Sequence, residues 1–390
     1  MIIYNAEIYS MTEDMHFYGY VEVQDGKITA VEQGKPESIR EGDIDAHGGV
    51  LMPGLIDAHT HLGIIEDGID FEGDDCNEIS DPFTPQLRAI DGINPYDRCF
   101  SEARASGITS VMVSPGSANA CGGEMLLMKT FGRCTDEMAV ATCGMKFALG
   151  ENPKSVYSDR DEAPVTRMMT AALIREGLQK AKLYSERLER FEEHPDEEEP
   201  PEYDAKCEAL LPLLTGRQKA HFHCHRADDI CTAARIAKEF GLDLVIIHGT
   251  GAHIAADLFG EWGLNIIVGP ILCDRCKPEM AQMDLSNAAI LHQKGVHIAI
   301  CTDHPEVPIQ YLRMSAALAV KGGLPREAAL RAITSEAADM LGVEDRIGRI
   351  AVGLDADLVL FPDDPLDMMQ DPEWVMIGGS MVTMPAGSSQ

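Results

Sequence analysis

Residues 54–61 read GLIDAHTH, an apolar run that ends in two histidines one residue apart. Successive side chains on a β-strand point to opposite faces, so His59 and His61 would share one face of such a strand. Two imidazoles placed in this way can bind the same divalent cation. Alone, the pair is equally consistent with histidines that only support packing, so it predicts half of a metal site whose other ligands must come from elsewhere.

Three later segments contain residues of the same kind. AHFHCH (220–225), LVIIHGT (244–250) and IAICTDHP (298–305) each place histidine or aspartate where an apolar run ends. The residues in question are His223, His248 and Asp303, all of types that bind zinc-like cations. Four segments with this pattern favour one shared metal site over four separate packing roles.

The region between residues 53 and 345 indicates which fold carries these segments. Strand-like runs such as SVMVS (110–114), MAVATCGMKF (138–147) and LNIIVGP (264–270) alternate with helical patterns such as DDICTAARIAKEF. Repeated β-then-α units imply a parallel sheet, and this many of them predict a TIM-like (β/α)₈ barrel of the α/β class. Each candidate ligand then lies at the carboxyl end of its strand, where barrel enzymes place their chemistry.

The two ends of the chain show a different pattern. Residues 1–52 contain the alternating segments YVEVQD and KITAVEQ, which are separated by Asp25-Gly26, a dipeptide favoured in tight hairpin turns. Residues 346–390 return to a strand pattern in GRIAVGLDADLVLF. We therefore expect both ends to form one small, discontinuous β-sandwich domain beside the barrel.

Composition restricts the partners and the location. The net charge of −32 repels nucleic acid and anionic membrane surfaces. No apolar run is long enough to predict a membrane span, and the opening MIIYNAEIYS lacks the features of a signal peptide. Eleven cysteines without regular spacing favour reduced thiols. We expect a cytoplasmic protein, with a homo-oligomer as one possible state, that binds a small molecule.

Two segments are predicted to be exposed additions to this core. ERLERFEEHPDEEEPPEYD (186–204) is strongly acidic and contains three prolines, which is typical of a solvated insertion between two helical stretches. The Gly- and Asp-rich residues 66–95 follow the first barrel strand. They predict either a partial lid over the site or an ordered surface loop.

The order of the metal-type residues, with His-x-His early, two separated histidines in the middle and one aspartate late, resembles the amidohydrolase superfamily of metal-dependent hydrolases. The resemblance covers nearly the whole chain, including the opening IIYNAEIYSMTEDMHFYGYVEVQDGKITAV, the strand GGVLMPGLIDAHTHLG and the closing GRIAVGLDADLVLF. Within that superfamily, PGSANACGGEMLLMKT (115–130) and GMKFALGENPK (144–154) are similar to the branch of imidazolonepropionase-related amidohydrolases.

This resemblance implies a ligand set. His59 and His61 would hold one cation, with Asp303 beside it, while His223 and His248 would hold a second. The implied cofactor is a divalent metal, most simply zinc, with one or two ions per chain.

Other residues have roles that the sequence leaves open. Two cations need an anion between them, and the resemblance implies that Lys146, carboxylated by carbon dioxide, is that bridge. Alternatively, Lys146 stays an ammonium that pairs with a nearby carboxylate or with the substrate, and the site holds one cation. Alternation places His221, His223 and His225 on one strand face; His223 matches the ligand position best, His225 becomes a substrate contact or a supporting histidine, and His221 a buried support. Asn119 is a further candidate for substrate binding.

Such a site implies hydrolysis of a carbon–nitrogen bond, in an amide or cyclic amide of a small molecule or dipeptide. A zinc-like ion lowers the pKa of its water toward about 7, which provides hydroxide at neutral pH. Asp303 can take the proton of the attacking water and deliver it to the leaving nitrogen. Deamination of a ring by the same chemistry is one alternative. A barrel without activity that serves in assembly or regulation is another.

Overall fold

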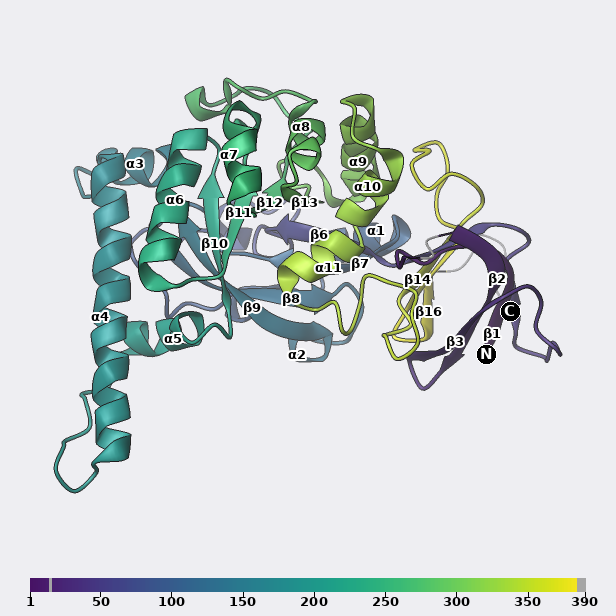
Figure 1. Ribbon diagram of the computed structural model, residues 1–390, viewed down its shortest axis with the longest axis horizontal. Coiled ribbons are helices and arrows are strands. Elements are labelled where there is room, and N and C mark those ends of the chain that lie inside the picture. The colour runs from purple at the N-terminus through teal and green to yellow at the C-terminus, as the bar shows by residue number, and fades with distance from the viewer. Residues whose placement is uncertain (14–15, 384–390) are drawn as a thin grey trace.

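The computed structural model describes residues 1–13 and 16–383 and contains two eight-stranded sheets (Figure 1). One of them is the barrel, whose neighbours follow chain order from β6 to β13. The sheet almost closes, because the amide of Asp303 donates to the carbonyl of His59 and the amide of His61 donates to the carbonyl of His304. Its strands are β6 (Leu55–Thr60), β7 (Ile108–Val113), β8 (Cys121–Lys129), β9 (Ala139–Ala148), β10 (Lys219–Cys224), β11 (Leu244–His248), β12 (Asn265–Val268) and β13 (His297–Ile300).

The barrel departs from an all-parallel sheet at β8. This strand runs antiparallel to both β7 and β9, whereas the other neighbouring pairs from β6 to β13 are parallel. The physical reason is the connection: residues 114–120 join β7 to β8 without a crossover helix, and a parallel strand requires one. The prediction of uninterrupted β-then-α units was therefore wrong for the segment around PGSANACGGEMLLMKT, although the barrel itself is confirmed.

Helices cover the outside of the barrel (Figure 1). α6 shows why they pack there, since its apolar residues recur at helical spacing and its Ile230, Ala233 and Ile236 are buried. Left-handed Gly241 ends this helix. The α-helices are α1 (Arg98–Ala105), α2 (Thr135–Met138), α3 (Glu151–Ser158), α4 (Arg167–Glu193), α5 (Ala205–Leu214), α6 (Ala227–Phe240), α7 (Ala256–Glu261), α8 (Asn287–Gln293), α9 (Leu312–Lys321), α10 (Arg326–Ala332) and α11 (Ser335–Leu341). Short 3₁₀ turns are η1 (Phe71–Gly73), η2 (Ala89–Asp91), η3 (Ala252–Ala255), η4 (Pro278–Met280) and η5 (Ile309–Tyr311).

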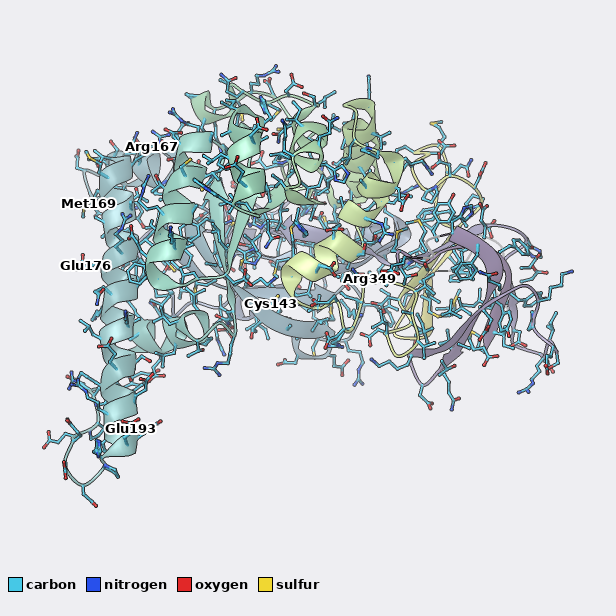
Figure 2. The ribbon with its side chains drawn as sticks, viewed as in Figure 1. Cys143, Arg167, Met169, Glu176, Glu193 and Arg349 are labelled. Carbon is cyan, nitrogen blue, oxygen red and sulfur yellow. The ribbon has the colours of Figure 1, made fainter. Side chains whose placement is uncertain are left out.

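The acidic segment is only partly an insertion. Its first residues continue α4 to Glu193, so the loop between α4 and α5 is limited to residues 194–204 (Figure 2). Charged residues with good helix propensity, such as the run ERLERFEE, sustain a solvated helix until Pro195. The loop itself is almost entirely exposed, as predicted.

Both ends of the chain join in the second sheet, in the order β16-β15-β14-β5-β1-β2-β3, with β4 paired to β1. The expected hairpin is present, with Asp25 and Gly26 both at positive φ between β2 and β3. Antiparallel pairing of β5 with β14 unites the N-terminal and C-terminal parts. The strands are β1 (Ile2–Tyr9), β2 (His16–Gln24), β3 (Lys27–Gln33), β4 (Ile44–Asp45), β5 (Val50–Pro53), β14 (Leu358–Phe361), β15 (Trp374–Ile377) and β16 (Ser380–Thr383).

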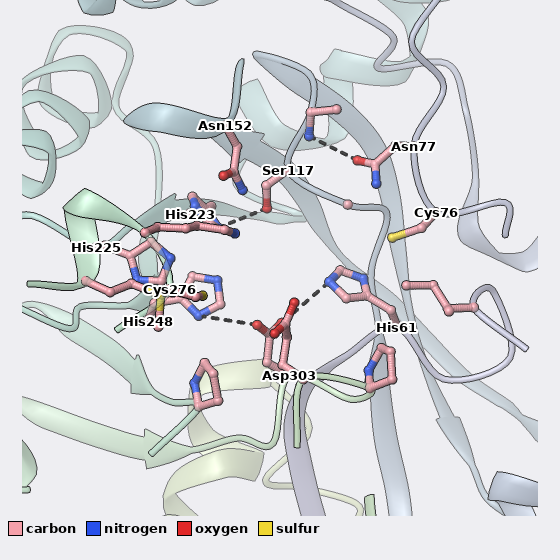
Figure 3. Close-up of a pocket in the computed structure, with 18 of the residues that line it drawn as sticks. His61, Cys76, Asn77, Ser117, Asn152, His223, His225, His248, Cys276 and Asp303 are labelled. Atoms are coloured by element: carbon pink, nitrogen blue, oxygen red, sulfur yellow. Dashed lines mark hydrogen bonds and ion pairs between the residues drawn. The ribbon is translucent and has the colours of Figure 1, made fainter. Parts of the chain in front are cut away.

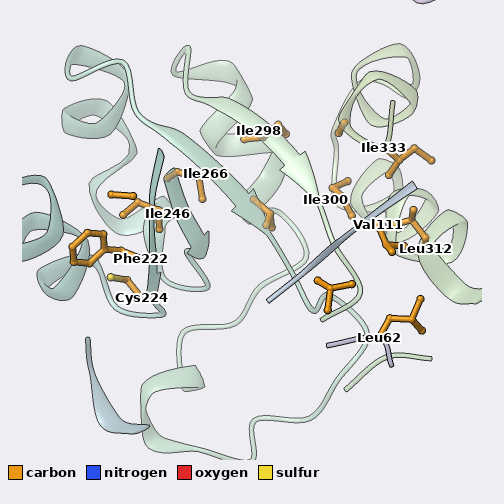
Figure 4. Packing of buried hydrophobic residues seen from close by; sticks show 14 of the residues in the cluster. Leu62, Val111, Phe222, Cys224, Ile246, Ile266, Ile298, Ile300, Leu312 and Ile333 are labelled. Atoms are coloured by element: carbon orange, nitrogen blue, oxygen red, sulfur yellow. The ribbon is translucent and has the colours of Figure 1, made fainter. Parts of the chain in front are cut away.

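Alternation along the barrel strands separates two apolar layers. Phe222, Ile246 and Ile266 pack outward against the helices (Figure 4), while neighbours such as Val245 and Ile267 belong to a separate cluster inside the barrel. The period of two residues therefore directs alternate side chains of β10 into the barrel. His221 and His223 lie on that inner face, and His225 follows the last residue of the strand.

Candidate metal centre

The first group of ligands contains His59, His61 and Asp303, all buried at the carboxyl edge of the barrel. The Nε2 atoms of His59 and His61 lie 3.3 and 3.5 Å from Oδ1 of Asp303. Nδ1 of His61 is 2.7 Å from the carbonyl oxygen of Ser114, which it can reach only as a donor, and this contact orients the ring with Nε2 toward Asp303. The structure therefore brings these three residues together, as the sequence analysis expected.

A second group contains His223, His225 and His248, whose ring nitrogens lie within 4.8 Å of one another. Each Nδ1 atom has its own hydrogen-bond partner, at 2.7 to 2.9 Å, which orients the ring. These partners are Ser117 Oγ for His223, Thr250 Oγ1 for His225 and the carbonyl of Gly269 for His248. The carbonyl of Gly269 can only accept, so Nδ1 of His248 is the donor and its neutral ring keeps the lone pair on Nε2. The two hydroxyls hold the rings of His223 and His225 in place.

Asp303 joins the two groups (Figure 3). It lies between the rings of His61 and His248, and its Oδ2 is 4.0 Å from Nδ1 of His248. Both Asp303 and His248 have positive φ values, 58° and 78°, which residues with a side chain rarely adopt. Such backbone strain concentrates at functional sites, and here it interrupts strand alternation at the ends of β11 and β13.

Asp57 helps to hold the backbone next to Asp303 in place. Its buried carboxylate accepts hydrogen bonds from the amide and the hydroxyl of Thr302, the residue before Asp303. Burial raises the pKa of Asp57 to about 7. The GLIDAHTH segment therefore contributes a positioning residue that the sequence analysis did not identify.

Burial sets the protonation of most ligands. It lowers the pKa of His59 to about 3 and holds the pKa values of His223 and His248 well below 6.5. These imidazoles are neutral at pH 7, the form that binds a cation. Burial alone would raise the pKa of Asp303, but His248, His59 and His61 together hold it well below its usual range.

Lys146 is completely buried on β9, and its Nζ lies 3.4 Å from Nε2 of His59. Within the described residues it forms no salt bridge, so the alternative of an ammonium paired with a protein carboxylate finds no partner there. Burial lowers the pKa of Lys146 to about 8. The structure thus places the lysine beside the first ligand group, as expected for a bridge.

A cavity of about 320 Å³ opens over both groups of ligands. His225, Asn152 and Lys277 line it together with Cys76 and Asn77 from residues 66–95. Two residues of the proposed lid therefore contribute to the cavity wall (Figure 3). Whether residues 66–95 open and close remains a prediction.

Asn119 does not line this cavity. Its amide nitrogen donates to the carbonyl of Glu78 and to Thr84, and its oxygen accepts from the hydroxyl of Tyr157. These contacts hold the loop between β7 and β8, and the expected contact of Asn119 with substrate stays a prediction. His221 is fully buried, as expected for a supporting residue.

Glu279 is the ligand-type residue that sequence reasoning missed. It lies in η4, and its side chain is 1% exposed. Its Oε1 lies 3.7 Å from Nε2 of His223 and 3.8 Å from Nε2 of His225. No apolar strand precedes it directly in the sequence, so the pattern that revealed the other ligands could not reveal this one.

Comparisons with known proteins agree with this architecture. The amidohydrolase family matches residues 50–382. The crystal structure of an amidohydrolase from Thermotoga maritima MSB8 is 40% identical, with a TM-score of 0.94 over 98% of this chain and 99% of that chain. Amidohydrolase tasK of Hapsidospora irregularis is 32% identical over 389 residues, which is 93% of this chain. An imidazolonepropionase of Fusobacterium nucleatum is 25% identical over 88% of this chain and 84% of the relative.

The chain spans 39% of the length of tasK. In the described residues, no helix is both long and apolar enough to cross a membrane.

Proposed function

The chain belongs to the amidohydrolase family, and from that premise we propose that it is a metal-dependent hydrolase that cleaves a carbon–nitrogen bond in an amide or cyclic amide. Its substrate is a small molecule or a dipeptide. One observation carries the proposal: two groups of three buried metal-type ligands converge beneath one open cavity at the carboxyl edge of the barrel.

The donor set fits zinc. Imidazole nitrogens and a carboxylate oxygen are the ligands that zinc takes in hydrolases. Several donors here are buried and have no hydrogen-bond partner in the part of the chain that the structure describes, namely Nε2 of His223, Oδ1 of Asp303 and Oε1 of Glu279. Leaving such atoms unsatisfied is costly, and a bound cation would satisfy them.

His59, His61 and Asp303 would hold one zinc ion and His223 with His248 a second, with Lys146 between them as a carbamate. Among the described residues Lys146 has no salt-bridge partner, and burial lowers its pKa. Both features favour the neutral amine, which is the form that reacts with carbon dioxide, so they support this role. When bound, the ions would acidify a water molecule and polarise the scissile carbonyl.

Residues of the chain would carry out proton transfer, exclusion of water and binding of the substrate. Asp303 is ionised and faces the cavity, so its carboxylate can take the proton of the attacking water and return it to the leaving nitrogen. The apolar walls formed by Ile65 and Val156 limit access of bulk water. Lys277, a cation on the rim, favours substrates that carry a carboxylate, such as an N-acyl amino acid or a dipeptide.

We also propose that the protein acts in the cytoplasm and has neither nucleic acid nor membrane as a partner, on account of its net charge of −32. Assembly into a homo-oligomer is compatible with this role.

The test is metal analysis of the purified protein followed by a screen of amides, dipeptides, N-acyl amino acids and cyclic amides. Release of an amine or opening of a ring supports the proposal. Release of ammonia from a heterocycle would instead identify a deaminase. Metal-loaded protein that turns over none of these classes would favour a non-catalytic role, and protein without affinity for zinc would contradict the proposal itself.

A further inference from the structure

Glu279 is a buried carboxylate that the two ligand sets named above do not include. The chain returns from β12 through residues 269–277, and η4 then inserts Glu279 beneath the cavity. Two hydrogen bonds with Glu151 hold its backbone and one oxygen of its side chain. Oε2 accepts a hydrogen bond of 2.8 Å from the amide of Glu151, and the amide of Glu279 donates in return to the Glu151 carboxylate.

The opposite oxygen, Oε1, points at the histidines. It has no hydrogen-bond partner in the described parts of the chain, and neither has Nε2 of His223. The distances of 3.7 and 3.8 Å to His223 and His225 are too long for hydrogen bonds. Two ligand atoms bound at about 2.1 Å to one tetrahedral ion lie about 3.4 Å apart. The two carboxylate–imidazole distances exceed this separation by only a few tenths of an ångström, so a small movement of Oε1 toward either ring gives the spacing of two ligands on one cation.

Local packing preserves this orientation. Gly150, at φ +87°, lies directly behind Glu279, and a Cβ atom at that position would come within 2.6 Å of Oε2. The close approach requires a glycine, because a side chain at position 150 would collide with the Glu279 carboxylate. Thr250 and Ser117 hold the Nδ1 atoms of His225 and His223, and the Nε2 atom of each ring lies within 4.0 Å of Oε1 of Glu279.

Charge favours the same conclusion. Asp303 supplies an anion chiefly to the first ligand group, through contacts of 3.3 and 3.5 Å with His59 and His61. The histidines of the second group are neutral and bring none of the charge that a divalent cation needs in a buried place. Glu279 is a carboxylate within 4.0 Å of two of them.

We propose that Glu279 is the carboxylate ligand of a cation held by His223 and His225, within reach of His248. This inference rests on the proposed function, since it assumes a metal-binding hydrolase. It assigns His225 as a ligand rather than a contact for substrate, and it gives each ligand group one carboxylate of its own.

The experiment measures zinc binding to full-length protein, independently of any activity. Metal-free wild type, Glu279→Gln and Glu279→Asp are titrated with zinc by calorimetry, and metal content is measured by mass spectrometry after dialysis. Glu306→Gln is the matched control, because Glu306 lines the same cavity but is exposed. Circular dichroism checks the fold of every variant.

We expect wild type and Glu306→Gln to bind two zinc ions. Glu279→Gln should bind one of them about 100-fold more weakly, since it keeps the shape but loses the anion, and Glu279→Asp should lie between. Folded Glu279→Gln protein with wild-type stoichiometry and affinity would overturn the inference, whether wild type binds one ion or two. Wild type that binds no zinc would instead overturn the proposed function. The graded order of the two variants separates ligation from damage to the fold.

Discussion

Replacing Lys146 with methionine should make the metal-free protein more stable at neutral pH. Lys146 is fully buried, its Nζ has only His59 nearby, and it lacks a carboxylate partner among the described residues. Burial of an unpaired ammonium is costly, and methionine fills similar space without charge. The prediction tests the feature on which the carbamate proposal depends, namely that no carboxylate among the described residues pairs with this lysine.

The magnitude follows from the pKa of Lys146, which burial lowers from 10.5 to about 8. A shift of this size corresponds to about 3 kcal/mol at 1.36 kcal/mol per unit. The folded pKa lies below the unfolded one, so between about pH 8 and 10.5 the unfolded state binds more protons and wild-type stability rises with pH. At pH 7 both states are protonated, and the full penalty applies.

This free-energy penalty corresponds to a shift of the melting temperature. An unfolding entropy of about 2.1 cal/mol/K per residue gives about 0.8 kcal/mol/K for 390 residues. Lys146→Met should therefore melt about 3–4 °C above wild type at pH 7, and this difference should shrink as the pH approaches 10.5.

The assay is scanning calorimetry of chelator-treated protein in buffer free of carbon dioxide, at several pH values. Lys129→Met is the matched control, because Lys129 is also buried but forms salt bridges with Asp355 and Asp357. Removing it leaves two carboxylates without their partner, so this variant should melt below wild type. The reasoning is refuted if Lys146→Met melts at or below the wild-type temperature at pH 7, with an unchanged pH profile.

The other predictions concern the ligands directly. His59→Ala should lose hydrolysis and one zinc ion while its circular dichroism stays that of wild type; near-normal turnover and metal content would show that His59 is not a ligand. Asp303→Asn should lower kcat by about 10²–10⁴-fold with a smaller loss of metal, because the amide cannot accept the proton of water, and a normal rate with a normal pH profile would reject that role. Chelation should abolish activity and lower the melting temperature, and added zinc should restore both; activity that survives complete removal of metal would contradict a metal-dependent reaction.

Periodicity explains why so much of the arrangement could be predicted. Alternation in GLIDAHTH and AHFHCH indicates which histidines share a face, and the position of each at the close of an apolar run indicates the edge of the barrel. The structure brings His59, His61 and Asp303 together at that edge. These residues were accessible to sequence reasoning because each lies at or just after the end of a buried apolar strand.

Features that depend on connections were not accessible in this way. Residues 114–120 are too short for a crossover helix, yet the antiparallel direction of β8 is clear only once its pairing with β7 and β9 is known. Asn119 lies in that same connection, and its polar side chain resembled a substrate contact. In the folded chain its hydrogen bonds to Glu78, Thr84 and Tyr157 hold that connection, and its contact with substrate stays a prediction.

The choice between His223 and His225 shows most clearly where a strand pattern stops being informative. The two residues lie two positions apart, at the end of β10 and directly after it, and alternation treats them as equivalent. The observation that bears on the choice comes from elsewhere in the chain, because Glu279 stands at nearly the same distance from both Nε2 atoms. Its own position depends on a backbone contact with Glu151 and on the absence of a side chain at Gly150. A carboxylate equally close to two histidines favours shared ligation over a choice between them, and this equivalence becomes visible only when the loop after β12 is folded against the barrel.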